Sequence, residues 1–259
     1  MKRDITVAGI KLELFEEGAG APLLFLHSGQ GFVPNQPFVG LLSKKRRLIA
    51  PSHPGFGASG LPEWLDTVED IAHVYLELMD RLDLRAVDVV ACSIGGWIAA
   101  EMGSKSPERF KKLVMVGPVG VKIGRVDKLD IPDVFAISQE QMTKLLWHDP
   151  SKAPPFDPAK LSDEELTAIV RNREALALLT WEPYMHNPKL KHRVHRITAP
   201  ALFLRGASDG LVSAEYLAGY AKLLPNARTD TIAAAGHGPQ NEQPEIFAQK
   251  VLSFLDAAA

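Results

Sequence analysis

Short apolar runs alternate with segments of helical spacing along most of this 259-residue chain. Most of the runs lack the strict apolar–polar alternation of a half-exposed strand, so they predict strands that are buried on both faces, as in a parallel sheet. Segment 5–18 instead predicts two short strands around a Gly turn, an antiparallel hairpin at the edge. Further strands are expected at the start of segments 21–31, 46–59, 86–93, 109–118, 199–210 and 227–238.

Helical patterns separate these strands. In segment 67–84 the apolar residues, among them Ile71, Tyr75 and Leu78, fall on one helical face, and Thr67 stands where a helix cap is expected. Further helices are expected within 94–107, 214–225 and 244–255. Repeated strand–helix units predict an α/β fold, with a mostly parallel central sheet and helices on both faces.

Residues 119–196 interrupt this rhythm. They contain helical patterns at 137–147 and 162–181 and no buried strand pattern. We interpret them as a helical cap inserted into a core formed by 1–118 and 197–259. A long crossover connection is the alternative, but the length of the insertion and its residues Trp147 and Trp181 favour a lid over the mouth of a site.

Composition narrows the class of protein without indicating its chemistry. Hydrophobic residues make up 46% and charged residues 23% of the chain, which is ordinary globular usage and argues against disorder. The net charge of −2 gives no reason to expect nucleic acid or an anionic membrane as partner. Cys92 is the single cysteine, and we expect neither a signal peptide nor a membrane span, so the sequence predicts a cytoplasmic protein.

The segment VDVVACSIGGWIAAEM carries the strongest chemical signal. A strand ends at Cys92, a helix follows Ser93, and the small residues Ala91 and Gly95 flank the serine at two-residue offsets. This pattern predicts a nucleophile elbow, a sharp strand–helix turn that presents a serine hydroxyl. A simple helix cap is the alternative for Ser93. Cys92 is the weaker nucleophile candidate, because Val90 and Ile94 would then have to fit the narrow turn.

A serine hydroxyl needs a base, and the base needs a third group to orient it. Asp209 and His237 both follow predicted strands, and the chain order Ser93, Asp209, His237 is the order that elbow-type hydrolases use. All three residues therefore lie at the carboxyl edge of the predicted sheet, where sites of open α/β sheets form. The sequence predicts a Ser–Asp–His catalytic triad.

The other histidines are not expected to act as the catalytic base. We expect His27 to fix its loop, and His53 either to line the cleft or to face water. The remaining five are expected on the surface or the cap, and their spacing with acids and Cys92 does not fit a metal site. We therefore expect neither a metal nor a cofactor.

Two backbone donors must hold the oxyanion of an acyl-transfer intermediate. The N–H of Ile94, directly after the nucleophile, is the first candidate, and the N–H of Gly29 in the loop after the strand at 23–26 is the second. In the same loop, Ser28 either lends its hydroxyl to a substrate or only shapes the turn.

At LHSGQG, PSHPGFGAS, ACSIGGW, GASDG and AGHGPQNEQPE the chain resembles the α/β-hydrolase superfamily. The resemblance covers nearly all of the chain outside 119–196, which corresponds to the variable cap of that superfamily. It implies the α/β-hydrolase fold and a serine triad. Two positions depart from the family pattern: Ala91 replaces the first glycine of the elbow, and Ser28 replaces the glycine that usually follows the loop histidine.

The resemblance also ranks the possible reactions. Dehalogenases and epoxide hydrolases place an aspartate at the elbow, where this chain has Ser93. Small carboxylesterases and lactonases are the nearest look-alikes. Hydrolases that cleave carbon–carbon bonds in ring-cleavage products are also close, although they usually carry a tryptophan directly after the triad histidine, where this chain has Gly238.

We therefore expect a serine hydrolase that cleaves a small carboxylic ester or lactone through an acyl-enzyme. The alternatives are a carbon–carbon hydrolase of vinylogous diketo acids and a non-catalytic binding protein of the same fold. Arg171 and Arg173 could meet a substrate carboxylate or could form a solvated helix face. The sequence leaves the substrate and the oligomeric state open. The cap residues expected to line the substrate pocket are Trp147, Trp181, Tyr184 and Phe135.

Overall fold

Eight strands form one mixed sheet in the computed structural model, which describes residues 1–154 and 157–258. The sheet order is β1-β2-β4-β3-β5-β6-β7-β8, and only the pairs β1–β2 and β2–β4 are antiparallel. The predicted edge hairpin and the mostly parallel sheet are both confirmed. The strands are β1 (Lys2–Val7), β2 (Ile10–Glu17), β3 (Pro22–Leu26), β4 (Arg47–Pro51), β5 (Val87–Cys92), β6 (Phe110–Val116), β7 (Ala201–Gly206) and β8 (Ala227–Ile232).

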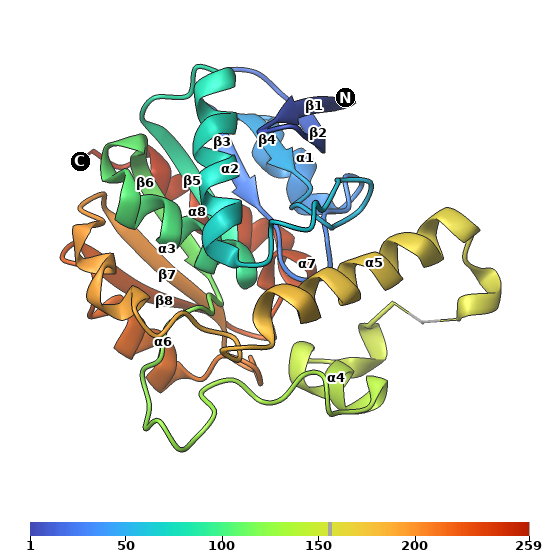
Figure 1. The fold of residues 1–259 in the computed structure, drawn as a ribbon. Helices are drawn as coiled ribbons and strands as arrows, with labels where there is room; N and C mark the ends of the chain where they lie inside the picture. Colours follow the sequence, from blue (N-terminus) through green and yellow to red (C-terminus); the bar gives the residue numbers. More distant parts are fainter. Residues whose placement is uncertain (155–156, 259) are drawn as a thin grey trace.

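Helices cover both faces of this sheet (Figure 1). Successive residues of a strand point to opposite faces, so β5 sends Val89 and Ala91 into one apolar core and Val90 and Cys92 into the other. The first core is shared with α2 (Val68–Arg81), α3 (Ile94–Lys105) and α6 (Ala214–Ala221). The second is shared with α1 (Pro37–Ser43) and α8 (Pro244–Asp256). Burial on both faces explains the continuous apolar runs of the sequence.

Local signals set the helix boundaries. Thr67 accepts a hydrogen bond from the Asp70 N–H, and the Asp70 carboxylate accepts one from the Thr67 N–H, so a capping box begins α2 at the predicted residue. The predicted apolar face of α2 is buried, with Ile71, Tyr75 and Leu78 fully covered. Helix α1 and the short α7 (Pro239–Glu242) were not predicted, because seven and four residues give too little periodicity to detect.

In the described residues between β6 and β7, the regular secondary structure consists of helices and one isolated bridge between Gly120 and His186, while 117–138 forms turns and irregular loop. Helix α4 spans Gln139–Leu146 and α5 spans Asp163–Thr180, close to the expected positions. In Figure 1 these two helices extend beyond the end of the sheet. The division into a core and a cap at 119–196 stays a prediction, and residues 155–156 of that stretch lie outside the described residues. Short 3-10 helices occupy Pro107–Arg109, Pro150–Lys152, Pro158–Lys160, Leu190–His192 and Val194–Arg196.

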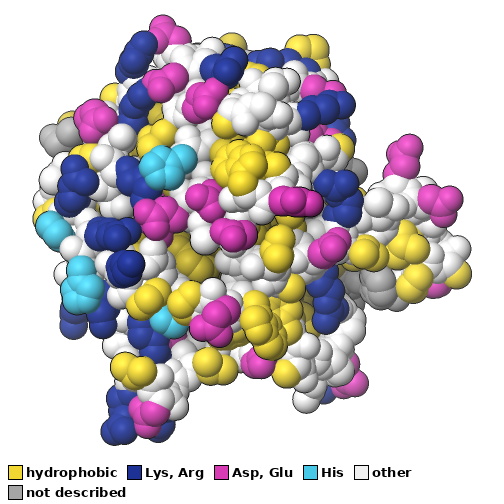
Figure 2. All heavy atoms as spheres, in the orientation of Figure 1, with side chains coloured by type: hydrophobic (Ala, Val, Ile, Leu, Met, Phe, Trp, Pro, Cys, Tyr) yellow, Lys and Arg dark blue, Asp and Glu magenta, His cyan; other side chains and the backbone are white. Residues whose placement is uncertain are grey.

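Charged side chains of both signs are interspersed on the face shown in Figure 2. Within the two described ranges, no helix combines the length and the apolar character that a bilayer-spanning segment needs.

The close packing of Gly95 in the turn between β5 and α3 can be tested by substitution. A Cβ at Gly95 would lie 2.4 Å from the Leu26 carbonyl oxygen and 2.7 Å from that of His27, both of them backbone atoms. We therefore expect Gly95→Ala to lower the free energy of unfolding by about 1–3 kcal/mol or more, measured by urea denaturation.

Gly40 is the matched control, because it lies inside α1 and a Cβ there would meet nothing within 4 Å. Gly40→Ala should raise stability by about 0.4–1 kcal/mol, since it reduces the entropy of the unfolded chain. A Gly95→Ala protein as stable as the parent would contradict the close approach.

Candidate active site

Ser93 occupies the sharp turn between β5 and α3, as the sequence predicts. Its backbone has φ 53° and ψ −115°, a sparsely populated conformation for a residue with a side chain. The turn is held because the Ser93 N–H donates to Val116 O at 2.9 Å, while the Ser93 carbonyl accepts from Gly96 N at 2.9 Å. The serine side chain is thus fixed at the carboxyl edge of the sheet, beside the start of α3.

Asp209 and His237 form a buried hydrogen-bonded pair. Asp209 Oδ2 lies 3.0 Å from His237 Nδ1, and the other oxygen, Oδ1, accepts the backbone N–H groups of Leu211 and Val212 at 2.9 Å each. Because the carboxylate can only accept, Nδ1 of a neutral His237 ring carries the proton and Nε2 is left as an acceptor. The pair therefore presents a base at Nε2, which is the atom that a serine proton would reach.

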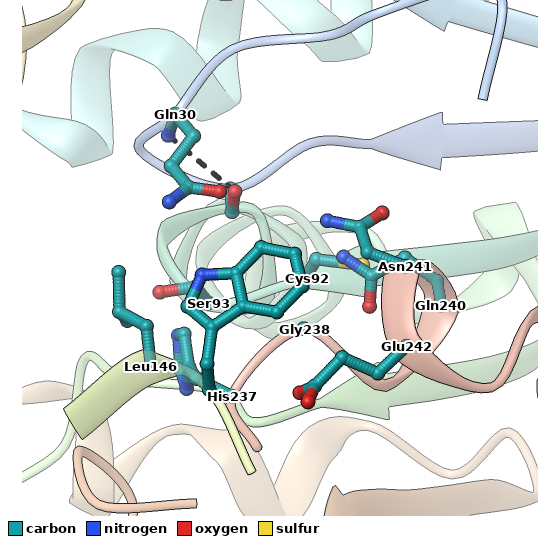
Figure 3. A pocket seen from close by; sticks show the side chains of 11 residues that line it. Gln30, Cys92, Ser93, Leu146, His237, Gly238, Gln240, Asn241 and Glu242 are labelled. Atoms are coloured by element: carbon teal, nitrogen blue, oxygen red, sulfur yellow. Dashed lines mark hydrogen bonds between the residues drawn. The ribbon is translucent and has the colours of Figure 1, made fainter. Parts of the chain in front are cut away.

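Ser93 and His237 line one cavity (Figure 3). His237 Nε2 is buried and has no hydrogen-bond partner among the described residues, so no bond joins it to the Ser93 hydroxyl in this conformation. The structure brings the three predicted residues to one place, and their catalytic roles stay a prediction. The lining of the cavity comprises Ser28, Gln30, Cys92, Ser93, Leu146, Trp147, His237, Gly238, Gln240, Asn241 and Glu242.

A glycine that sequence analysis did not single out makes room for the Asp–His pair. Gly117, directly after β6, has φ +48°, and a Cβ there would lie 3.0 Å from His237 Cε1 and 3.2 Å from Asp209 Oδ2. The Arg205 guanidinium, which is buried, donates from Nη2 to the Asp209 carbonyl oxygen at 3.0 Å. The sequence offers one signal for Gly117, since a glycine directly follows a strand whose end borders the predicted site.

The end of α4 is bonded directly to the loops that carry the pair. The Gly210 N–H donates to Leu145 O at 2.9 Å, and the His237 N–H donates to Leu146 O at 2.8 Å. The Glu242 carboxylate accepts from both Gly236 N, at 2.6 Å, and His148 N, at 2.9 Å. Sequence analysis missed Glu242, because nothing in its local pattern indicates a bridge to a residue 94 positions away.

The expected oxyanion donors come from two segments, the start of α3 for Ile94 and the loop after β3 for Gly29. Ile94 is the first residue of α3, so its N–H has no acceptor within that helix. A Cβ at Gly29 would lie 2.8 Å from Leu176 Cδ2 of α5, so the glycine loop lies tightly against that helix. Ser28 lines the cavity, and its Oγ accepts a long 3.4 Å hydrogen bond from Gln30 N. The assignment of Gly29 and Ile94 as oxyanion donors stays a prediction.

His27 fixes its loop as expected, but the expectation for His53 is wrong. The His53 side chain is fully buried, neither lining the cleft nor facing water, since its Nδ1 meets Tyr75 OH at 2.6 Å and its Nε2 meets His27 O at 2.9 Å. His27 Nε2 accepts the His53 N–H at 2.9 Å, and the two rings stack with centroids 3.6 Å apart. Burial lowers the pKa of His27 to about 4, although its bond to the Ser28 carbonyl opposes this, and burial also holds the pKa of His53 well below its usual value.

Of the four residues expected to line the pocket, only one is found among the described residues of its lining. Trp147, at the end of α4, lines the cavity. Trp181 is 56% exposed and packs on Phe135 with ring centroids 5.7 Å apart. Tyr184 OH donates to Pro132 O at 2.6 Å and accepts from Val134 N at 2.8 Å, so it holds the loop that contains these two residues. Trp181, Tyr184 and Phe135 are absent from the lining.

Arg171 and Arg173 are not among the described residues that line the cavity. Arg171 Nη2 donates to Ser59 O at 2.6 Å, and Arg173 is exposed. Between them, Asn172 donates to Gln30 O at 2.9 Å and accepts from Gly57 N at 2.9 Å. This part of α5 is therefore hydrogen-bonded to the loop after β3 and to the loop after β4. Among the described residues that line the cavity there is no lysine or arginine.

Cys92 lies beside Ser93 and also lines the cavity, but its thiol is buried. Burial raises the pKa of this thiol, which keeps it protonated and unreactive. Among the described residues no group of three or more histidine, cysteine or acidic side chains is arranged to hold a metal ion.

The histidine pair predicts a pH-dependent stability. The pKa of His27 is about 4 in the native chain and 6.5 in the unfolded chain. Between these pH values the unfolded chain therefore binds a proton at His27 that the native chain does not bind. The free energy of unfolding should therefore be highest above pH 6.5 and fall by up to about 3 kcal/mol as the pH drops toward 4.

Urea denaturation across this pH range measures the effect. His27→Gln should flatten the pH dependence, whereas the exposed His195→Gln should leave it unchanged. An unaltered slope in His27→Gln would contradict the burial of a neutral imidazole.

Comparisons with known proteins agree with this geometry. The sequence model of the alpha/beta hydrolase fold matches residues 21–244. The 2-hydroxymuconate semialdehyde hydrolase of Pseudomonas putida is 27% identical over 99% of this chain and 94% of the relative. The 2-hydroxy-6-oxo-2,4-heptadienoate hydrolase of Pseudomonas putida strain F1 is 29% identical over 98% of this chain and 96% of the relative. The solved meta-cleavage product hydrolase of Pseudomonas fluorescens IP01 superposes with a TM-score of 0.79 at 19% identity over 98% and 97%. The strand order, the elbow and these matches together show that the chain belongs to the alpha/beta hydrolase fold family.

Proposed function

We propose that this protein is a serine hydrolase that cleaves a carbon–carbon bond in a small vinylogous keto acid of the 2-hydroxymuconate semialdehyde type. The observation that carries the proposal is the buried Asp209–His237 pair, whose unpartnered Nε2 lies at the cavity that also holds Ser93. The full-length similarity to two hydrolases of such acids supports this substrate class over a simple ester.

The proposed chemistry uses the groups in the cavity as follows. His237 Nε2 takes the proton of the Ser93 hydroxyl, and the serine oxygen adds to the terminal carbonyl, C6 of the substrate. The N–H groups of Ile94 and Gly29 hold the oxyanion. Asp209 holds the ring in the tautomer that this transfer needs and stabilises the imidazolium.

Breaking a carbon–carbon bond also requires a place for the bonding electrons. In the keto tautomer the 2-hydroxyl proton has moved to C5, and the C5–C6 electron pair can pass through the conjugated chain to the C2 carbonyl oxygen. That oxygen takes the proton from His237, which releases a 2-hydroxydienoate. Water, activated by His237, then cleaves the ester on Ser93, so one water is consumed and C6 leaves as a carboxylic acid.

Ester or lactone hydrolysis is the second candidate function. It is favoured by one observation: the described residues that line the cavity include no lysine or arginine, and an ester, unlike a keto acid, brings no carboxylate. Gly238, in place of the expected tryptophan of carbon–carbon hydrolases, points the same way. The two reactions share the acylation of Ser93 and differ in the leaving group.

Turnover assays separate the two candidates. The parent protein should convert 2-hydroxymuconate semialdehyde to formate and 2-hydroxypentadienoate, a reaction that is monitored through the loss of the visible absorbance of the substrate. Its kcat/KM should lie well above that for aryl acetates. Ser93→Ala should lower this turnover by about 10³-fold or more, because the nucleophile is lost.

Cys92→Ala is the matched control, since it changes the neighbouring buried side chain and leaves the proposed nucleophile in place. It should keep turnover within a few-fold. Hydrolysis of aryl acetates alone would favour the esterase, and full activity of Ser93→Ala would contradict both reactions.

Labelling with a fluorophosphonate probe tests whether the protein is an enzyme or a binding protein of this fold. We expect one label per chain, on Ser93, because His237 can activate that hydroxyl. Asp209→Asn should slow labelling by roughly 10²–10⁴-fold, since the imidazole loses the partner that fixes its tautomer. Mass spectrometry of the labelled peptide provides the measurement. A Ser93 that never reacts would favour a binding protein.

A further inference from the structure

One segment of the chain, 145–148, is bonded to both loops that carry the Asp–His pair. Its carbonyl groups accept the N–H of Gly210, the residue after Asp209, and the N–H of His237 itself. The same segment supplies Trp147 to the lining of the cavity. We call 145–148 the clamp segment, because a displacement of it would move the cavity wall and pull on both loops.

The clamp segment packs backbone to backbone against the two loops. A Cβ at Gly236 would lie 2.2 Å from Leu146 O, and a Cβ at Gly210 would lie 2.9 Å from Leu145 O. Glycine at both positions is therefore a condition of this close approach. Because no side chain separates the segment from the loops at these points, a shift of the segment is passed on to the loops directly.

The Glu242 carboxylate adds a bridge between the clamp segment and the loop of His237. Its Oε1 accepts the Gly236 N–H at 2.6 Å, one residue before His237, and its Oε2 accepts the His148 N–H at 2.9 Å, at the end of the clamp segment. Figure 3 shows the Glu242 side chain turned from α7 toward His237. Hydrogen bonds to an ionised acceptor are roughly twice as strong as neutral ones, so this bridge is a firm one.

The proposed chemistry gives Glu242 no step of its own. Both of its oxygens accept backbone N–H groups, so the side chain is suited to holding the backbone in place. What it holds is the loop that aims His237 Nε2. A misplacement of a reacting group by about 1 Å can cost about 10²-fold in rate, so the reaction is sensitive to a small movement of this loop.

We propose that Glu242 is a positioning residue that couples the clamp segment to His237, so that the base is held within reach of Ser93 only while the clamp segment is seated. This inference rests on the proposed function, because Glu242 acts through His237. It also extends that function, since it makes the Trp147 wall of the cavity and the base one unit. A substrate that contacts Trp147 would thereby stabilise the working position of His237.

The rate of fluorophosphonate labelling at Ser93 tests the coupling without an identified substrate. Glu242→Gln retains the size of the side chain but has only one accepting oxygen, so it loses one of the two bonds. It should slow labelling by about tenfold. Glu245→Gln, in the exposed first turn of α8, is the matched control and should be labelled at the parent rate.

The bond at the clamp segment can also be removed from its other end. Proline lacks an N–H, and the extended backbone of Trp147, with φ −114° and ψ 139°, suits a residue before proline. His148→Pro should therefore be labelled several-fold more slowly than His148→Ala, which loses the 2.7 Å contact with Ser208 Oγ but retains the N–H. The double variant of Glu242→Gln with His148→Pro should be at most about twofold slower than the slower single variant, because both changes break one bridge.

A spectroscopic readout separates positioning from a general loss of stability. The proton on His237 Nδ1, held by Asp209, should give a proton NMR resonance far downfield of the amides, assigned by its loss in His237→Gln. Glu242→Gln should shift or broaden this resonance, whereas Glu245→Gln should leave it in place. Thermal unfolding of each variant verifies that it is folded.

The outcomes keep the coupling and the proposed function apart. Labelling of Glu242→Gln at the parent rate, or losses that multiply in the double variant, would overturn the coupling and leave the serine hydrolase standing. A parent protein that is never labelled would contradict the proposed function, and the His237 resonance then decides the coupling. A resonance that is unchanged in Glu242→Gln would overturn the coupling in either case.

Discussion

The contact on which this site depends is the close approach of α3 to the end of β3. Gly95 faces the carbonyl oxygens of Leu26 and His27 with no space for a Cβ, so this close approach of α3 to β3 requires a glycine at position 95. The turn holds Ser93 in its strained backbone conformation and places the Ile94 N–H at the open end of the helix. It also brings the loop of His27 and Gly29 to the same edge, so one steric condition positions both the serine and the loop beside it.

A second constraint links the segment between β6 and β7 to the chemistry. The carbonyl groups of Leu145 and Leu146 accept the N–H groups of Gly210 and His237, so the end of α4 is bonded to the loops of both Asp209 and His237. Asn172 of α5 forms hydrogen bonds with Gln30, in the loop after β3, and with Gly57, in the loop after β4. The backbone carbonyls of α4 and the Asn172 side chain of α5 therefore help to set the position of the loops that carry the site residues.

Buried polar groups in this region divide into those that are satisfied inside the chain and those that are not. His27 and His53 satisfy each other, Tyr75 and the Ser28 carbonyl, which makes them a rigid support of the loop. His237 Nε2, Gln240 and Asn241 retain buried atoms without a partner, and all three lie in one cavity. Unpaired polar atoms are unfavourable inside a protein, so a substrate bound here under the proposed function would complete their hydrogen bonding.

The sequence by itself determined the parallel sheet, the edge hairpin, the capped helix α2 and the turn at Ser93. Each of these follows from short-range regularities: apolar runs, helical spacing, a capping box and small residues at fixed offsets. Ser93, Asp209 and His237 each follow a predicted parallel strand. Because parallel strands end at the same edge of a sheet, this placed all three residues at one edge. Only the tertiary structure decided which side chains reach the cavity. Trp181 packs on Phe135, Tyr184 bonds the Pro132 carbonyl and His53 is buried, whereas Gln240, Asn241 and Glu242 line the cavity. These outcomes depend on contacts between segments far apart in the chain, for which no local pattern of residues provides a signal.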